Sequence, residues 1–429
     1  MSHITASAAA HGHGHDHGHQ QADMSAANTT WGGKAIAGIL MVIGIVAVGL
    51  TVLGGFSVDL THALAAYHIG AMTCLAMALG CTFWVMAFHL TQAGWSVTIR
   101  RQFENVMSLV PAVTLMVFPV LIIEIFKRGL LFAWMDTKPG GIAAGDILLT
   151  EKSAFLNPVF FMVRAAVYLL VWSYLAMRLW RYSTEQDRTG NKWLTNSARF
   201  TSSWGMPLFA ITVAFASFDW LMSMDYRFFS TMWGVYFFAG AAFSSVPLIV
   251  IVLGRLRAAG KLKGLVTEEH FHDLAKLMFG FTVFWAYIAF SQYFLIWYAN
   301  IPEETSFMLA RKTDGWEHLS RFLIIGHFAL PFFILLWRFV RRSPGLLAVM
   351  AFWAIFMEIA DIYWIVRPFV YDVDPSDKIH LGRIWLDIVG ITGPIAIFAG
   401  LVIRKVASGP LVPTHDPRLS EAIHHKNYV

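Results

Sequence analysis

Ten stretches of mainly apolar residues follow one another along the chain, separated by short polar segments. A helix needs about 20 apolar residues to cross the hydrocarbon core, and it pairs its own backbone polar groups there. The stretches that reach this length are 35–56, 66–91, 104–126, 157–180, 201–223, 231–254, 273–298, 318–338, 344–366 and 383–402. Connections as short as 225–230 allow only antiparallel neighbours. The pattern predicts an all-α integral membrane protein with ten transmembrane helices.

Basic residues gather in alternate connections and so predict the orientation. They include Arg100 and Arg101, then the basic residues within 178–199, 255–263 and 338–342, and then Arg404 and Lys405. The remaining connections are acidic or mixed. Because cytoplasmic loops carry the excess of Lys and Arg, both termini are expected in the cytoplasm of a bacterial inner membrane. The long outer connection 127–155 is large enough to cover a neighbouring protein.

Composition removes several classes of function. The chain is 57% hydrophobic and only 14% charged, which excludes an ordinary soluble domain. Its net charge of +5 comes from residues at the helix ends, so it does not indicate a nucleic-acid partner. The two cysteines, Cys74 and Cys81, lie inside one apolar stretch and lack the spacing of a zinc, iron–sulfur or haem-attachment motif. They are interpreted as packing residues.

Both ends of the chain differ from the membrane domain, which we place at 34–405. Residues 1–33 carry a low-complexity run with histidines from His11 to His19 and are expected to be disordered in the cytoplasm. Metal collection by these histidines is an alternative that no other feature supports. The segment 406–429 is polar and is expected to be a cytoplasmic tail, either docked or loose.

Polar residues inside the spans concentrate toward the outer side. Placing a charged group in hydrocarbon costs free energy unless the group is paired or hydrated, so each charged residue inside a span needs an explanation. The outer set is His68, Glu124, Arg164, Asp219, Gln292, Tyr293, Arg321, Glu358, Asp361 and Asp387, with His327 near the middle. The inner set, His89, Glu104 and Lys276, lies where long side chains can reach water. This skew predicts a polar cavity that opens outward.

Glu358 and Asp361 are the most informative pair. They are three residues apart on one helix face, and two adjacent carboxylates cannot both stay ionised comfortably in a low dielectric. One interpretation is a proton relay, and the other is a salt bridge to Arg164, Arg321 or Arg367. For Asp387 the simpler interpretation is neutralisation by Arg383, four residues earlier.

His68 and His327 raise the question of a haem, which needs two axial imidazoles at matched depth on different helices. The spans lack the two widely spaced histidines per helix that diheme cytochromes show, so packing or proton transfer explains these residues better. The spans also contain no phosphate-binding glycine loop, hydrolase triad or metal-ligand cluster.

Two sequence segments carry a resemblance to a known family. One is SFDWLMSMD at 217–225 followed by STMWGVYFFAG at 230–240, and the other is AFSQY at 289–293 followed by WYANIPEE at 297–304. With DLAKLMF at 273–279 and the ten-helix layout, they resemble the F-type membrane subunit of alternative complex III, the bacterial quinol:cytochrome c oxidoreductase. The resemblance covers roughly residues 30 to 405.

The resemblance implies a polysulfide-reductase-like membrane protein with two four-helix bundles, helices 2–5 and 6–9, flanked by the terminal helices. It implies no cofactor bound by this chain, a quinol or menaquinol substrate in the complex, and haem c and iron–sulfur clusters in partner subunits. The implied partners are a homologous C-type membrane subunit, a periplasmic iron–sulfur subunit, and cytochrome c subunits that pass electrons to a cytochrome c or a terminal oxidase.

The resemblance also implies a proton route, whose residues in this chain are those that match the polar positions of the family's proposed route. These are Asp219, Gln292, Tyr293, Glu358 and Asp361. His327 and Asp387 join them as candidates by depth, and Arg164 and Arg321 are candidate charge partners. The quinone-binding residues and any metal ligands are left unassigned. An autonomous secondary transporter and a purely structural membrane anchor remain the competing hypotheses.

Overall fold

The computed structural model describes residues 32–141, 143–313, 315–371 and 383–427. These residues form helices joined by turns, and ten of the helical spans are long and apolar enough to cross a membrane. The prediction of an all-α membrane protein with ten spans is therefore confirmed. The histidine run and the acidic residues Asp372, Asp374 and Asp377 lie outside the described residues. The end of the bundle predicted to face outward is called the outer end, and the opposite end the inner end.

The first five spans are formed by seven helical segments. They are α2 (Lys34–Ser57), α3 (Leu60–Leu90), the series η1 (Gly94–Ser96), α4 (Val97–Met107) and α5 (Val110–Phe126), then α7 (Pro158–Thr189) and α8 (Trp193–Trp220). The outer connection before α7 contains η2 (Ala133–Met135) and α6 (Ile147–Lys152), and η3 (Met222–Met224) follows α8.

The last five spans contain one interrupted helix. They are α9 (Trp233–Ala258), α10 (Glu268–Ala299), the series α12 (Trp316–Leu323), η4 (Ile324–Ala329) and α13 (Leu330–Leu336), then α15 (Pro344–Val366) and α17 (Ile384–Val406). Short helices α11 (Pro302–Leu309), α14 (Arg338–Arg342), α16 (Pro368–Tyr371) and α18 (Leu419–Ile423) lie at the two ends of the bundle.

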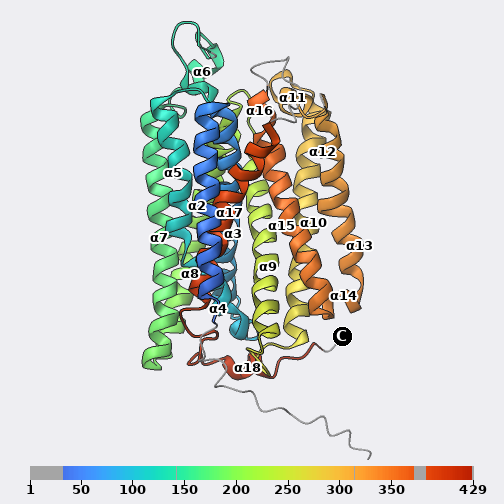
Figure 1. Cartoon of the computed structure of the whole chain (residues 1–429). Helices are drawn as coiled ribbons and strands as arrows, with labels where there is room; N and C mark the ends of the chain where they lie inside the picture. The colour runs from blue at the N-terminus through green and yellow to red at the C-terminus, as the bar shows by residue number, and fades with distance from the viewer. Residues whose placement is uncertain (1–31, 142, 314, 372–382, 428–429) are drawn as a thin grey trace, which may run out of the picture.

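Two helices at the centre join the halves of the molecule. In Figure 1, α5, α7 and α8 stand on one side and α10, α12, α13 and α15 on the other, while α3 and α9 pack against each other between them. The contact is close because Gly80 has no side chain: a Cβ there would lie 1.9 Å from the carbonyl oxygen of Ala241. The terminal spans α2 and α17 pack against each other and onto α3, again through glycines such as Gly44 and Gly393.

The third span is longer than hydropathy predicts, and this corrects the inner polar set. It begins at Gly94 instead of 104, and its added part is polar yet buried. Glu104 is fully buried, with its Oε1 2.9 Å from Nε of Arg100, and Arg101 reaches Asp187 at 2.5 Å. The prediction that Glu104 reaches water was wrong. Buried charges are found at the inner end too, so the outward skew does not by itself indicate a cavity.

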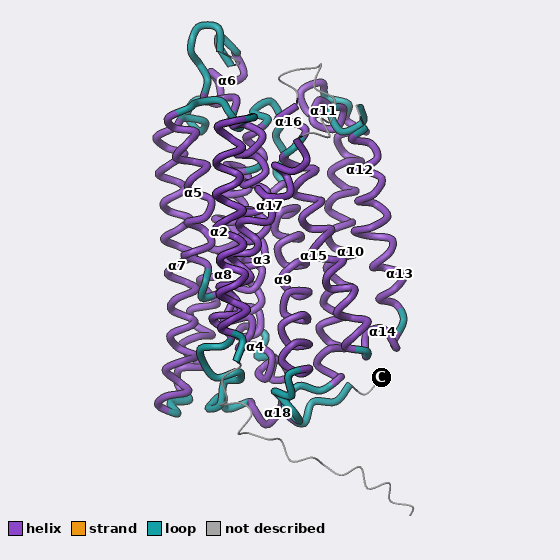
Figure 2. Tube along the Cα trace, in the orientation of Figure 1, coloured by secondary structure: helices purple, strands orange, loops and turns teal. Residues whose placement is uncertain are grey.

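The C-terminal tail is docked, which decides between the two alternatives left open by the sequence. Residues 407–427, here called the strap, run across the end of the bundle at which α2 begins (Figure 2). Leu411 and Val412 are fully buried. Asp416 Oδ2 accepts a hydrogen bond of 2.6 Å from Arg100, and His425 Nε2 lies 2.6 Å from Asp273 Oδ2 on α10.

Candidate functional site: a buried carboxyl cluster

Glu358 and Asp361 lie on one face of α15, as their spacing predicts, and each is 2% exposed. Asp361 accepts two hydrogen bonds from other helices. Tyr236 Oη of α9 donates to Oδ1 at 2.5 Å, and Trp285 Nε1 of α10 donates to Oδ2 at 3.3 Å. Both donors are neutral, so the contacts of Asp361 within hydrogen-bond distance include no cation.

Glu358 packs against the backbone of α9 at Gly240. A Cβ at Gly240 would lie 2.9 Å from Oε1 and 3.1 Å from Oε2 of Glu358, so an alanine there would displace this carboxyl group. Oε2 is buried without a hydrogen-bond partner. A buried polar atom without a partner is uncommon and asks for an explanation such as water, a proton or a ligand.

His327 joins the cluster through Trp285. Its ring stacks on the Trp285 ring with centroids 3.8 Å apart and contacts Phe243 at 4.9 Å. His327 is fully buried and both its ring nitrogens are without hydrogen-bond partners. It lies in η4, a π-helical turn, and such turns are frequent at functional sites. Trp285 thus contacts Asp361 with its indole N–H and His327 with its ring face.

Gln292 and Tyr293 have different surroundings. Gln292 lies two helical turns after Trp285 on the same face of α10, is 5% exposed, and has both amide atoms unpartnered. Tyr293 is 38% exposed, with Lys312 Nζ 5.3 Å from its ring centroid. Gln292 therefore extends the buried cluster toward the outer end, whereas Tyr293 lies on the outside of the bundle.

Arg311, in the connection between α11 and α12, lies beside this cluster at the outer end. It is 1% exposed, and its guanidinium donates to the carbonyls of Phe307 and Ile365, each at 2.7 Å. Burial lowers the pKa of Arg311 to about 9, and the negative charges of Asp225 and Asp361 oppose this shift. Burial also raises the pKa of Asp225, which follows η3 at the outer end. Arg311 thus interacts through space with both Asp361 and Asp225.

Asp219 belongs to a separate ion pair in the other half of the bundle. Arg164 of α7 holds it with two hydrogen bonds, Nε to Oδ2 at 2.8 Å and Nη2 to Oδ1 at 2.7 Å. Tyr168 Oη donates to Oδ2 at 2.6 Å. The bidentate geometry and complete burial of Asp219 are typical of a structural pair. Arg164 is thus a charge partner, but of Asp219 and not of Glu358 or Asp361.

Asp387 has a different partner from the one that helix spacing indicates. Arg367, which follows α15, forms an ion pair with its Oδ1, while Oδ2 lies 3.3 Å from His62 Nε2. Arg383 instead donates to Asp59 at 3.0 Å. The expectation that Arg383 neutralises Asp387 was wrong because the end of α15 packs beside the start of α17 and brings Arg367 closer.

The remaining predicted residues stand apart from the cluster. Arg321 is exposed and takes part in none of the ion pairs of the described residues. His68 Nε2 lies 2.8 Å from the carbonyl oxygen of Trp220, so its surroundings differ from those of His327. Within the described ranges, no group of three or more His, Cys, Asp or Glu side chains could hold a metal ion.

Sequence reasoning missed Tyr236, Trp285 and Arg311. Neutral aromatic donors are common in membrane spans, so Tyr236 and Trp285 carried no signal until α9 and α10 were placed beside α15. Arg311 did have a signal in the sequence. It is a basic residue on the acidic side of the predicted topology, and the positive-inside rule does not explain a basic residue there.

Comparison of the chain with known family models and with curated proteins found no match. The geometry of the cluster is therefore the basis for its chemistry. Two adjacent carboxyl groups, a phenol and an imidazole can pass protons, and the π-face of Trp285 holds the imidazole in place.

Proposed function

We propose that the chain is the F-type membrane subunit of an alternative complex III, a quinol:cytochrome c oxidoreductase of the bacterial inner membrane, with both termini in the cytoplasm. In this proposal Glu358 and Asp361 exchange the protons that accompany quinol oxidation. The resemblance and the site support each other: the segment 230–240 supplies Tyr236 and Gly240, and the segment 289–293 supplies Gln292.

The observation that carries the proposal is a buried carboxyl pair without a cation in contact. A salt bridge was the competing interpretation, and it needs Arg164, Arg321 or Arg367. Arg164 is engaged by Asp219, Arg367 by Asp387, and Arg321 is exposed. Arg311 acts on Asp361 only through space, because its guanidinium donates to backbone carbonyls. Carboxyl groups this close in a low dielectric hold at least one proton between them, which is the property that a relay requires.

The proposed complex provides the redox groups. This chain would bind no cofactor of its own, while partner subunits carry haem c and iron–sulfur clusters and a homologous C-type membrane subunit lies beside it. Quinol or menaquinol is the proposed electron donor, and a cytochrome c or a terminal oxidase the acceptor. Proton translocation by this chain is a part of the proposal that rests on the carboxyl cluster alone.

The test uses the intact complex, extracted gently and reconstituted in vesicles. Glu358→Gln with Asp361→Asn keeps shape and hydrogen bonding while removing both titratable protons, so quinol oxidation and proton release should fall with assembly retained. Glu317→Gln, which removes an acid at the outer end of α12, is the matched control and should behave as wild type.

Unchanged turnover and proton release in the double variant would contradict the relay and assign the chain to a structural anchor. Substrate-dependent uptake by the isolated chain in vesicles would instead establish an autonomous transporter. Mass spectrometry of the purified complex would identify it if haem-bearing and iron–sulfur subunits co-purify with this chain in fixed stoichiometry.

A further inference from the structure

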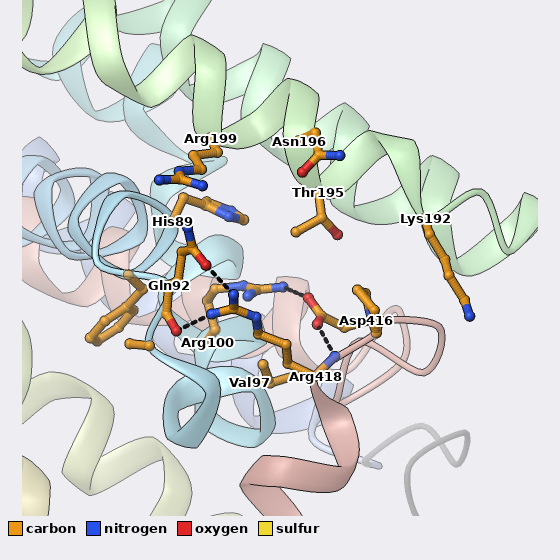
Figure 3. A pocket seen from close by; sticks show the side chains of 13 residues that line it. His89, Gln92, Val97, Arg100, Lys192, Thr195, Asn196, Arg199, Asp416 and Arg418 are labelled. Carbon is orange, nitrogen blue, oxygen red and sulfur yellow. Dashed lines mark hydrogen bonds and ion pairs between the residues drawn. The ribbon is translucent and has the colours of Figure 1, made fainter.

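A cavity of about 280 Å³ opens at the basic end of the bundle (Figure 3) and shares no residue with the carboxyl cluster. Its walls come from the end of α3, the start of α4, the start of α8 and the strap. Its lining includes four cationic side chains and one carboxylate: Arg100, Lys192, Arg199, Arg418 and Asp416. A space of this size accommodates a phosphate group together with several waters.

The single carboxylate is already neutralised. Asp416 accepts 2.6 Å and 2.9 Å hydrogen bonds from the Arg100 side chain and the Arg418 backbone N–H. Burial acts to raise the pKa of Asp416, but the Arg100 guanidinium outweighs it and holds the pKa below its ordinary value. Lys192 and Arg199 have no carboxylate partner among the described residues. The cavity therefore keeps an excess of positive charge.

Neutral donors lie between these two cations. Lys192, Thr195, Asn196 and Arg199 are spaced three, four and seven residues apart at the start of α8 and so share one face. Figure 3 shows Arg199 beside His89 at one end of this row and Lys192 at the other. Thr195 Oγ1 accepts 2.8 Å from Gln186 Nε2, which leaves its own hydrogen free to donate. Cations combined with hydroxyl and amide donors form the usual environment of a bound phosphate.

The same turns of α8 carry large apolar side chains that face outward. Trp193 is 69% exposed and Phe200 is 70% exposed. Tryptophan at a span end beside Lys and Arg is typical of the membrane–water interface. The positive-inside rule accounts for cations at this end, but it does not account for their grouping around one half-open cavity. The cavity thus lies at the level of lipid headgroups.

We propose that this cavity binds the phosphate group of an anionic phospholipid, with Lys192 and Arg199 as its main cations and Thr195 and Asn196 as hydrogen-bond donors. A phospholipid headgroup and free phosphate would both present a phosphate anion to these residues. The expected source of the anion is the surrounding bilayer. Arg418 and Asp416 of the strap form part of the wall of this cavity. This site is independent of the proton relay.

The test is native mass spectrometry of the full-length protein after delipidation, with phosphatidylglycerol, phosphatidylcholine or inorganic phosphate added back. Each Lys or Arg near a membrane surface strengthens binding of an anionic lipid about fivefold, so Lys192→Gln with Arg199→Gln should weaken phosphatidylglycerol binding roughly 30-fold. Arg181→Gln with Arg404→Gln removes two exposed charges from the same end and is the matched control.

Binding of phosphatidylglycerol over phosphatidylcholine, lost in the cavity variant and kept in the control, supports the proposal. Asn196→Asp is a second variant that adds one negative charge to the cavity, and it should also weaken binding if the first variant fails to fold. Equal binding by the cavity variant, the control and wild type would overturn the proposal. Binding of inorganic phosphate without phosphatidylglycerol would overturn the lipid source while locating a soluble phosphate in the cavity.

Discussion

The two buried acidic sites should respond differently to the same chemical change, aspartate to asparagine. Asp219→Asn leaves the Arg164 guanidinium buried and unneutralised, and it breaks the bidentate pair of 2.8 Å and 2.7 Å hydrogen bonds because asparagine keeps only one acceptor oxygen. Breaking a buried pair from one side costs about 3–5 kcal/mol. Asp361→Asn leaves no hydrogen-bonded cation behind, since the donors to Asp361 are a phenol and an indole N–H and Arg311 is held by backbone carbonyls, and should cost about 1–2 kcal/mol.

The predicted difference in the free energy of unfolding is therefore about 2 kcal/mol, or roughly 30-fold in the folding equilibrium. It can be measured by SDS titration of the full chain in mixed micelles, with both variants run in parallel. A double variant, Arg164→Met with Asp219→Leu, removes the whole ion pair and should recover most of the loss, because no lone charge remains.

An equal loss of stability in Asp361→Asn and Asp219→Asn would refute the predicted difference between the two sites. That result would mean that Asp361 holds the bundle together, and the assignment of the carboxyl pair to proton transfer would lose its physical basis. Failure of the double variant to recover stability would show that Tyr168 and the packing around Arg164 dominate at the other site.

Two further predictions concern the geometry of the cluster and the docking of the strap. The added Cβ in Gly240→Ala should displace the Glu358 carboxyl group and slow proton release in the complex about tenfold. Gly280→Ala is the control, because a Cβ at Gly280 meets open space, and it should release protons at the wild-type rate. Equal rates of proton release in the two variants would contradict the role of this contact. The pKa of Asp416 lies below its ordinary value of 3.8, so its contact with Arg100 stabilises the docked strap above that pH and is lost as pH falls through the lower folded value. The protection factors of the strap amides, which correct for the intrinsic pH dependence of exchange, should stay high between about pH 5 and 8 and fall only in stronger acid; a fall between pH 7 and 5 would assign docking to another group.

The membrane class, the number of spans and the alternation of their direction all followed from the amino-acid sequence alone. Each of these depends on local composition: about 20 apolar residues must form a helix in lipid, and short connections force neighbours to run antiparallel. The i, i+3 relation of Glu358 and Asp361 was equally local, since helix geometry alone places both side chains on one face. Helix ends were less certain where polar residues such as Arg100 are buried by protein instead of lipid.

The pairing of charged side chains, in contrast, depends on the tertiary structure. Asp387 had an arginine four residues away, yet Arg367, twenty residues away in sequence, pairs with it because α15 and α17 converge at the outer end. Tyr236, Trp285 and Asp361 come from three helices, so no spacing along the chain could have joined them. Hydropathy measures how a segment meets lipid, whereas ion pairs and relays depend on helix rotation and depth, which packing of the whole bundle sets.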